Sequence, residues 1–153
     1  MKPLLIFDFS GVLANKNDKS FKKGIVEFLQ KCNKDFDISV WTSGKYRNYN
    51  HLVQGLERDL NFNFLFCWYR DRTQFDPNYG IDPDINDFDT IKNLSQVINS
   101  PTLNYDRYYN KDNIIIVDDS LKKVCMNKHY VIADNDSFDS LYDKIMKKYS
   151  EMN

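Results

Sequence analysis

The sequence predicts an α/β domain built on a parallel sheet of about five strands, with helices on both faces of the sheet. Two observations support this class. Short, uninterrupted apolar runs recur along the chain, and between them lie segments whose apolar residues repeat at helical spacing. Uninterrupted apolar runs are typical of strands buried on both faces, as in a parallel sheet. With 153 residues, 42% of them hydrophobic, the chain is long enough for one core, and we treat residues 1–153 as one domain.

The first part of the chain alternates three strands with two helices. The apolar run at residues 4–7 ends at an aspartate and predicts the first strand. Residues 24–32 place their apolar side chains on one helical face and predict the first helix. A second strand is predicted at 38–41, where Thr-Ser-Gly follows the run, and a helix over 46–60 carries a longer apolar stripe. The run at 64–67 predicts the third strand.

The middle of the chain interrupts this alternation. Residues 68–90 hold prolines, a glycine and many aspartates, a composition that predicts a loop or small insertion. We expect a short helix over 91–98, with Asp89 as its N-terminal cap. Residues 100–112 are rich in tyrosine and asparagine, which indicates a second excursion over the surface.

The last part of the chain returns to alternating strands and helices. The run Ile-Ile-Ile-Val at residues 114–117 is the clearest strand signal, and it leads directly into two aspartates. A fifth strand is predicted at 130–132. A final helix is predicted over 138–149, with Asp136 or Ser137 as its cap.

Composition and charge exclude several classes of function. The 21 lysines and arginines nearly balance the 22 aspartates and glutamates, so the net charge is -1 and no broad basic surface for nucleic acid is expected. No apolar run approaches the roughly 18 residues that a membrane helix needs, and we expect no membrane partner. The three cysteines lack Cys-x-x-Cys spacing, which disfavours disulfides and zinc. We expect a soluble intracellular protein, whose oligomeric state the sequence leaves open.

Polar side chains follow three of the predicted strands, at the point where each strand ends. These residues are Asp8, Thr42, Ser43, Asp118 and Asp119. Ligands of open parallel sheets bind at the carboxyl ends of the strands, so we expect these side chains to meet. Converging carboxylates repel one another unless a cation lies between them, and oxygen ligands without histidine or thiolate favour Mg²⁺.

The remaining groups suit a phosphate. Hydroxyl and backbone N–H groups at the start of a helix can bind phosphate oxygens, as Thr42 and Ser43 would. A lysine such as Lys92 would offset the remaining negative charge. The sequence therefore predicts a Mg²⁺–phosphate site with Asp8 as the candidate nucleophile.

These residues lie in an ordered set of motifs. The set comprises residues 8–13 (Asp-Phe-Ser-Gly-Val-Leu), 41–43 (Trp-Thr-Ser), 92–95 (Lys-Asn-Leu-Ser) and 117–120 (Val-Asp-Asp-Ser). It resembles the motifs of the haloacid-dehalogenase (HAD) superfamily. Within that superfamily it most resembles the NLI-interacting-factor-like group, a branch of small phosphatases that act on the carboxy-terminal domain of RNA polymerase II. Lys-Lys-Gly at 22–24 and Tyr-Arg-Asp at 69–71 extend the resemblance over nearly the whole chain. It implies a HAD-like, Rossmann-like fold without a large cap domain.

The resemblance implies a role for each matching position. Asp8 would be the nucleophile that forms an aspartyl-phosphate and also a Mg²⁺ ligand, and Asp119 would complete the metal site. The residue at position 10 would offer its backbone carbonyl to Mg²⁺, and its side chain normally acts as the general acid and base. Thr42, with Ser43 beside it, would bind the phosphate.

Two further roles and one departure follow from the same resemblance. Lys92 would steady the nucleophile and the transferring phosphoryl group. Asp118 would either join the metal ligands or hold Lys92 in place, and we favour the second role. The departure is Ser10, which stands where the family has an aspartate. A hydroxyl preserves the backbone carbonyl but not proton transfer, which is typically worth about 10²–10⁴-fold in rate.

Two functions of different classes remain open. The first is a Mg²⁺-dependent phosphohydrolase that acts slowly on a phosphoprotein or a small phosphoester. The second is a catalytically inactive relative that serves as a protein-binding or scaffold module. The presence of Asp8, Lys92 and Asp119 favours the enzyme, because a scaffold has no need of them.

Overall fold

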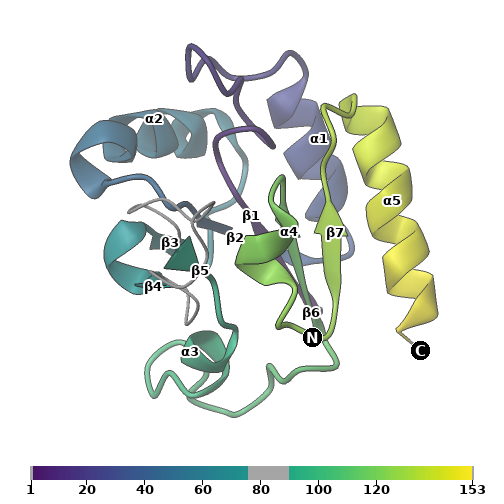
Figure 1. Cartoon of the computed structure of the whole chain (residues 1–153). Helices are drawn as coiled ribbons and strands as arrows, with labels where there is room; N and C mark the ends of the chain where they lie inside the picture. The colour runs from purple at the N-terminus through teal and green to yellow at the C-terminus, as the bar shows by residue number, and fades with distance from the viewer. Residues whose placement is uncertain (1, 76–89, 153) are drawn as a thin grey trace.

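The computed structural model describes residues 2–75 and 90–152. Its central element is a five-stranded parallel sheet in the order β3-β2-β1-β6-β7 (Figure 1). The strands are β1 (Leu4–Phe7), β2 (Asp37–Trp41), β3 (Cys67–Trp68), β6 (Ile114–Asp118) and β7 (Tyr130–Ile132). Strand order reverses between β1 and β6, and the carboxyl ends of β2, β1 and β6 meet at one edge. The predicted α/β class is confirmed.

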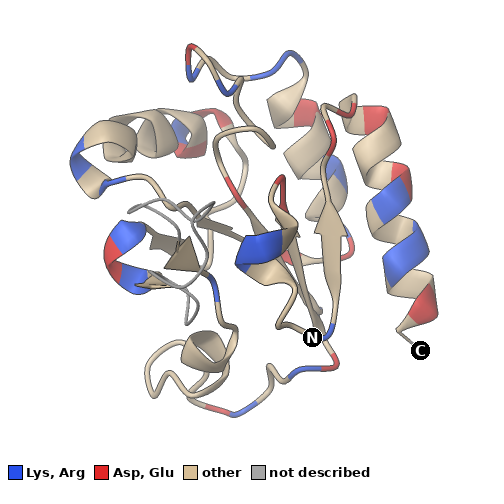
Figure 2. Cartoon of the chain, in the orientation of Figure 1, with Lys and Arg blue, Asp and Glu red and all other residues tan. Residues whose placement is uncertain are grey.

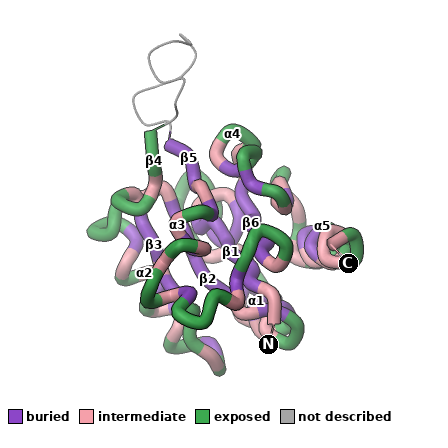
Figure 3. Tube along the Cα trace, turned by 90° about the horizontal axis from the view of Figure 1, so that it is seen from below, coloured by how far each residue is buried: buried purple, intermediate pink, exposed green. Residues whose placement is uncertain are grey.

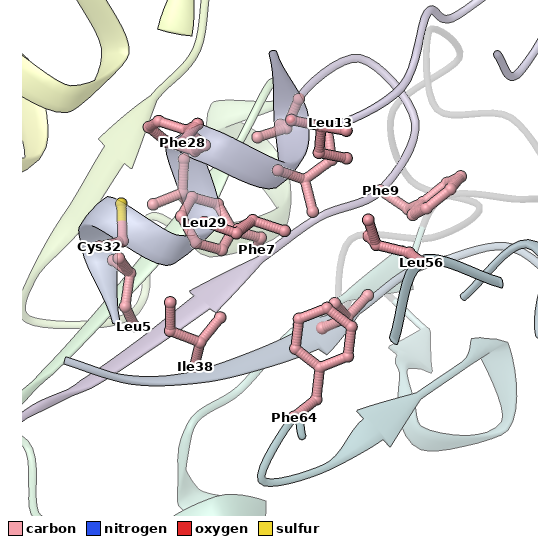
Figure 4. Packing of buried hydrophobic residues seen from close by; sticks show 14 of the residues in the cluster. Leu5, Phe7, Phe9, Leu13, Phe28, Leu29, Cys32, Ile38, Leu56 and Phe64 are labelled. Carbon is pink, nitrogen blue, oxygen red and sulfur yellow. The ribbon is translucent and has the colours of Figure 1, made fainter. Parts of the chain in front are cut away.

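Helices cover both faces of the sheet. They are α1 (Ile25–Cys32), α2 (Tyr46–Asp59), α3 (Ser95–Ile98), α4 (Leu121–Val124) and α5 (Phe138–Glu151). Because successive strand residues point to opposite faces, the sheet divides its side chains between two apolar clusters. Leu5 and Phe7 pack in the cluster with α1, α2 and α5, where Figure 4 shows them beside Phe28 and Leu29. Leu4 packs in the cluster with α3 and α4. Figure 3 shows the central strands buried between these layers.

The last helix begins where the sequence predicts, at Phe138, and ends two residues later than predicted, at Glu151. The Ser140 N–H donates to the Ser137 hydroxyl at 3.1 Å, so Ser137 is the cap of α5. Asp136, the other predicted cap, instead accepts hydrogen bonds from Lys144 and from the Ser140 hydroxyl. No helix within residues 2–75 and 90–152 is long and apolar enough to cross a membrane.

The third strand begins three residues later than predicted. Phe64 and Phe66 are buried, but Leu65 between them is 42% exposed, so the apolar run is not buried on both faces. This run lies at the edge of the sheet, where β2 is its only neighbouring strand. Regular pairing begins at Cys67 opposite Val40 and extends over two residues.

The short helix predicted over 91–98 is wrong in its first half. Thr90–Ile91 form β5, which pairs antiparallel with β4 (Gln74–Phe75), and α3 begins only at Ser95. The insertion predicted over 68–90 is not a plain loop where it is described, because Trp68 belongs to β3 and Thr90 to β5. A 3₁₀ turn, η1 (Arg70–Arg72), and then β4 follow β3, and residues 76–89, including Asp89, lie outside the described residues.

The tyrosine- and asparagine-rich stretch at 100–112 forms turns and irregular backbone, and two of its residues are buried. Asn104 donates to the carbonyls of Ile98 and Tyr109. The Tyr109 hydroxyl donates to Asp37 at 2.6 Å. These bonds tie the excursion to the sheet, and the purely surface location expected for it is wrong for Asn104 and Tyr109.

Candidate active site

Five of the predicted site residues line one cleft at the carboxyl edge of the sheet. The cleft has a volume of about 430 Å³. The five are Asp8, Ser10, Thr42, Ser43 and Asp119. The loops after β1, β2 and β6 supply them, so the parallel arrangement brings together residues that are distant in the sequence. The other two, Asp118 and Lys92, are fully buried and reach the cleft through Asp8.

Lys92 lies between two carboxylates inside the protein. Its Nζ donates to Asp118 Oδ2 at 2.6 Å and lies 3.2 Å from Asp8 Oδ1. Asp8 Oδ1 also accepts a hydrogen bond from the Phe9 N–H at 2.9 Å, and Asp118 Oδ1 accepts one from the Ser120 N–H at 3.0 Å. Asp118 therefore holds the lysine against Asp8 in this structure.

Burial and neighbouring charges shift the ionisation of these groups. Burial raises the pKa of Asp8 to about 7, against the opposing effect of Lys92, and the carboxylates of Asp118 and Asp119 add to the rise. Burial and Asp118 also raise the pKa of Asp119. Burial alone would lower the pKa of Lys92, but Asp8 and Asp118 outweigh it and the net shift is upward. The lysine thus stays charged beside an excess of carboxylates, which favours a bound cation.

Tertiary hydrogen bonds replace the predicted helix around Lys92. The Lys92 N–H donates to the Lys123 carbonyl at 2.8 Å. The Asn127 side chain donates to the Lys92 carbonyl at 2.8 Å and accepts from the Leu94 N–H at 3.0 Å. In a helix over this stretch the Lys92 carbonyl would accept a hydrogen bond from within the helix. Here Asn127 donates to it instead, and the helix starts later, at Ser95. Asn127 belongs to no motif, and sequence reasoning missed it.

Three carboxylates are close enough to share a metal ion. Asp8, Asp118 and Asp119 each offer an oxygen within 4.8 Å of the others. Gly11 makes this possible: its φ is 85°, and a Cβ at this position would lie 2.3 Å from Asp119 Oδ2. A cluster with only oxygen donors fits a hard divalent cation.

The cleft is also lined by hydroxyl groups, those of Thr42 and Ser43. The Ser43 hydroxyl oxygen is buried and has no hydrogen-bond partner within the described part of the chain. Such a group is unfavourable unless a ligand satisfies it, so it suits a phosphate oxygen. Thr42 Oγ1 accepts from the Gly44 N–H at 3.1 Å, which leaves its own O–H available to donate. Gly44 is required here, because a Cβ would lie 1.9 Å from the Tyr49 ring.

Sequence reasoning missed several residues that line the cleft. They are Lys16, Tyr49, Arg70 and Lys123. Arg70 lies in the motif at 69–71, and its Nε donates to the Ser43 carbonyl at 2.7 Å. The other three come from a loop and from helices that carry no motif, so no local signal marks them.

Replacing Lys92 with methionine is expected to destabilise the protein. The change leaves Asp8 and Asp118 buried without their cation, and removing one partner of a buried ion pair costs about 3–5 kcal/mol of unfolding free energy. Because Lys92 lowers the pKa of Asp8, its loss raises that pKa further above 7. The cost should therefore be larger at about pH 8 than at about pH 5, where Asp8 takes up a proton.

Urea unfolding at the two pH values measures this effect. The matched control is Lys122→Met, which removes a lysine from an exposed position of α4 and should change the unfolding free energy by less than about 0.5 kcal/mol. Equal stability of the Lys92→Met variant and the wild type at both pH values would contradict the prediction.

Comparison with known proteins identifies a family to which the chain belongs. No curated protein matches the chain. A family model described as NLI interacting factor-like phosphatase matches residues 5–152, a range that runs from β1 through α5 and includes all seven predicted site residues. The chain therefore belongs to the NLI interacting factor-like phosphatases, the branch of the HAD superfamily that its motifs resemble.

Proposed function

We propose that the chain is a Mg²⁺-dependent phosphohydrolase that transfers the phosphoryl group of its substrate to Asp8. The observation that carries the proposal is the fully buried Lys92, held between Asp8 and Asp118 beneath a cleft lined by the carboxylates of Asp8 and Asp119. A buried ion pair contributes little to stability compared with apolar residues of similar volume, so stability alone does not account for it. Membership of a phosphatase family supports the same chemistry.

The chain's own groups would perform the first chemical step. A carboxylate oxygen of Asp8 attacks phosphorus, the bond from phosphorus to the leaving oxygen breaks, and its electron pair departs with that oxygen. Lys92 orients the nucleophile and offsets negative charge on the transferring group. The Thr42 and Ser43 hydroxyls donate to phosphoryl oxygens and align the substrate. Water then hydrolyses the aspartyl-phosphate, which releases phosphate and restores Asp8.

The carboxylates of the cleft fit Mg²⁺. The ion would be held by Asp8, Asp119 and the backbone carbonyl of Ser10. When bound, it neutralises negative charge on the phosphoryl group. The Ser10 side chain cannot act as a general acid near neutral pH, so the leaving oxygen departs without a proton. We therefore propose that the protein hydrolyses aryl phosphates, including aryl phosphate esters on protein side chains, faster than phosphoserine.

Removal of the metal tests this proposal. The wild type should release nitrophenol from 4-nitrophenyl phosphate in Mg²⁺, and EDTA should abolish the release. A proton on Asp8 competes with the metal, so the Mg²⁺ concentration for half-maximal rate should increase as the pH falls below about 7. A rate that is unaffected by EDTA would contradict the metal requirement.

The alternative is a protein-binding or scaffold module, and Ser10 is the observation that favours it. A module of this kind would show no turnover with any aryl phosphate. Binding of beryllofluoride, which mimics the phosphoryl group on aspartate, separates the two functions further. The enzyme should bind it in Mg²⁺, whereas a scaffold with a degraded site should not.

The cysteines support an intracellular location. Cys32, Cys67 and Cys125 are all free thiols, and Cys32 is buried. Free thiols persist in reducing compartments. We therefore propose that the protein works in the cytoplasm or nucleus on a phosphoprotein or a small phosphoester.

A further inference from the structure

The loop between β1 and α1 brings a lysine to the outer carboxylate of the site. Lys16 Nζ lies 3.7 Å from Asp119 Oδ2, and both residues line the cleft with Asp8 and Ser10. The Lys16 side chain is 77% exposed, whereas that of Asp119 is 21% exposed. Lys16 thus approaches the carboxylate cluster from solvent, whereas Lys92 contacts it from inside the protein.

The backbone of this loop is well anchored, although the lysine side chain is not. The Gly11 N–H donates to the Ala14 carbonyl at 2.8 Å. The Asn15 N–H donates to the Ser20 carbonyl at 2.7 Å, and the Asn15 side chain donates to the Ser20 hydroxyl at 2.9 Å. These bonds place Lys16 at the mouth of the cleft, and its long, exposed side chain can move without disturbing them. In Figure 2 the loop, at the top of the view, carries basic segments.

The two lysines compensate different carboxylates. Lys92 neutralises charge on Asp8 and Asp118 from inside, and Lys16 pairs with Asp119 from outside. The ligands proposed for Mg²⁺ include Asp119. A divalent cation bound there would repel the ammonium group and compete with it for the same carboxylate.

We propose that Lys16 is a displaceable counter-ion of Asp119. In the metal-free protein it offsets the charge of this carboxylate, and Mg²⁺ binding releases it to the mouth of the cleft beside Ser10. The freed Lys16 ammonium group then lies beside Ser10, where the family has an aspartate, and faces an anionic substrate from there. This inference rests on the proposed function in one respect, namely that Mg²⁺ binds at Asp8 and Asp119.

Calorimetric titration of the full chain with Mg²⁺ alone tests the inference. The Lys16→Met variant should bind Mg²⁺ two- to five-fold more tightly than the wild type at low ionic strength, as expected when an exposed ion pair worth up to about 1 kcal/mol is removed. The difference should shrink in about 0.5 M salt, which screens exposed charges. The matched control is Lys23→Met, which removes an exposed lysine that lines a separate groove between α1 and α5.

Each outcome bears on a different statement. Equal or weaker binding by Lys16→Met, with the wild type binding Mg²⁺, overturns the role of Lys16 alone. Equal strengthening by Lys23→Met also overturns it, because the effect would then come from net charge. Absence of Mg²⁺ binding in every variant overturns both the metal site and this inference. Tighter binding by Lys16→Met without any phosphatase activity supports the counter-ion and contradicts the proposed function.

Discussion

Replacing Asp8 with asparagine is expected to reduce hydrolysis of 4-nitrophenyl phosphate by about 10⁴-fold or more, to the rate in buffer. The amide cannot attack phosphorus to form the acyl-phosphate bond that the proposed mechanism requires. Asparagine has nearly the same shape, and its oxygen can still accept the hydrogen bond from the Phe9 N–H. The loss would therefore be chemical rather than structural.

Stability measurements separate the two causes. Burial raises the pKa of Asp8, which means that the folded protein disfavours the charged form, and a neutral amide should be tolerated. We expect the unfolding free energy to change by less than about 1 kcal/mol, measured by urea unfolding at neutral pH. A variant that is folded and still hydrolyses the substrate at the wild-type rate would exclude Asp8 as the nucleophile.

Replacing Ser10 with aspartate is expected to raise the rate, by about 10²-fold or more for alkyl phosphates. The new carboxyl would protonate the leaving oxygen and later activate water for hydrolysis of the aspartyl-phosphate. Ser10 lines the cleft and is only partly buried, so the larger side chain has room. Aryl phosphates should gain less, because their leaving groups depart without a proton.

The matched control for this gain is Ser10→Asn, which adds the same volume without a proton to transfer. Rates for a series of phosphates that differ in leaving-group pKa should depend on that pKa less steeply in Ser10→Asp than in the wild type. A gain shared by Ser10→Asn would indicate a steric effect instead. If neither the wild type nor Ser10→Asp hydrolyses any phosphate, the scaffold function is the better explanation.

Much of the fold could be predicted because buried parallel strands leave a simple pattern. The strands at 4–7 and 114–117 lie at or within one residue of their predicted positions, because every residue of β1 and β6 is buried. The strand at 130–132, at one edge of the sheet, also lies where it was predicted. The third strand was misplaced because its apolar run at 64–67 is not buried throughout: Leu65 is 42% exposed, and pairing with β2 begins only at Cys67. Helical periodicity at 91–98 was misleading because the bonds from Lys123 and Asn127 prevail over local preference.

The sequence by itself determined where the chemistry-bearing residues stand: a strand end is local, so Asp8, Thr42 and the pair Asp118–Asp119 could be located from the apolar runs before them. The resemblance of residues 8–13 to the family motif also led to the prediction that Ser10 stands in place of an aspartate. Only the tertiary structure decided how these groups act on one another, because distance, burial and charge compensation depend on residues far apart in the chain. The buried position of Lys92, the orphaned hydroxyl of Ser43 and the approach of Lys16 to Asp119 have no local signature.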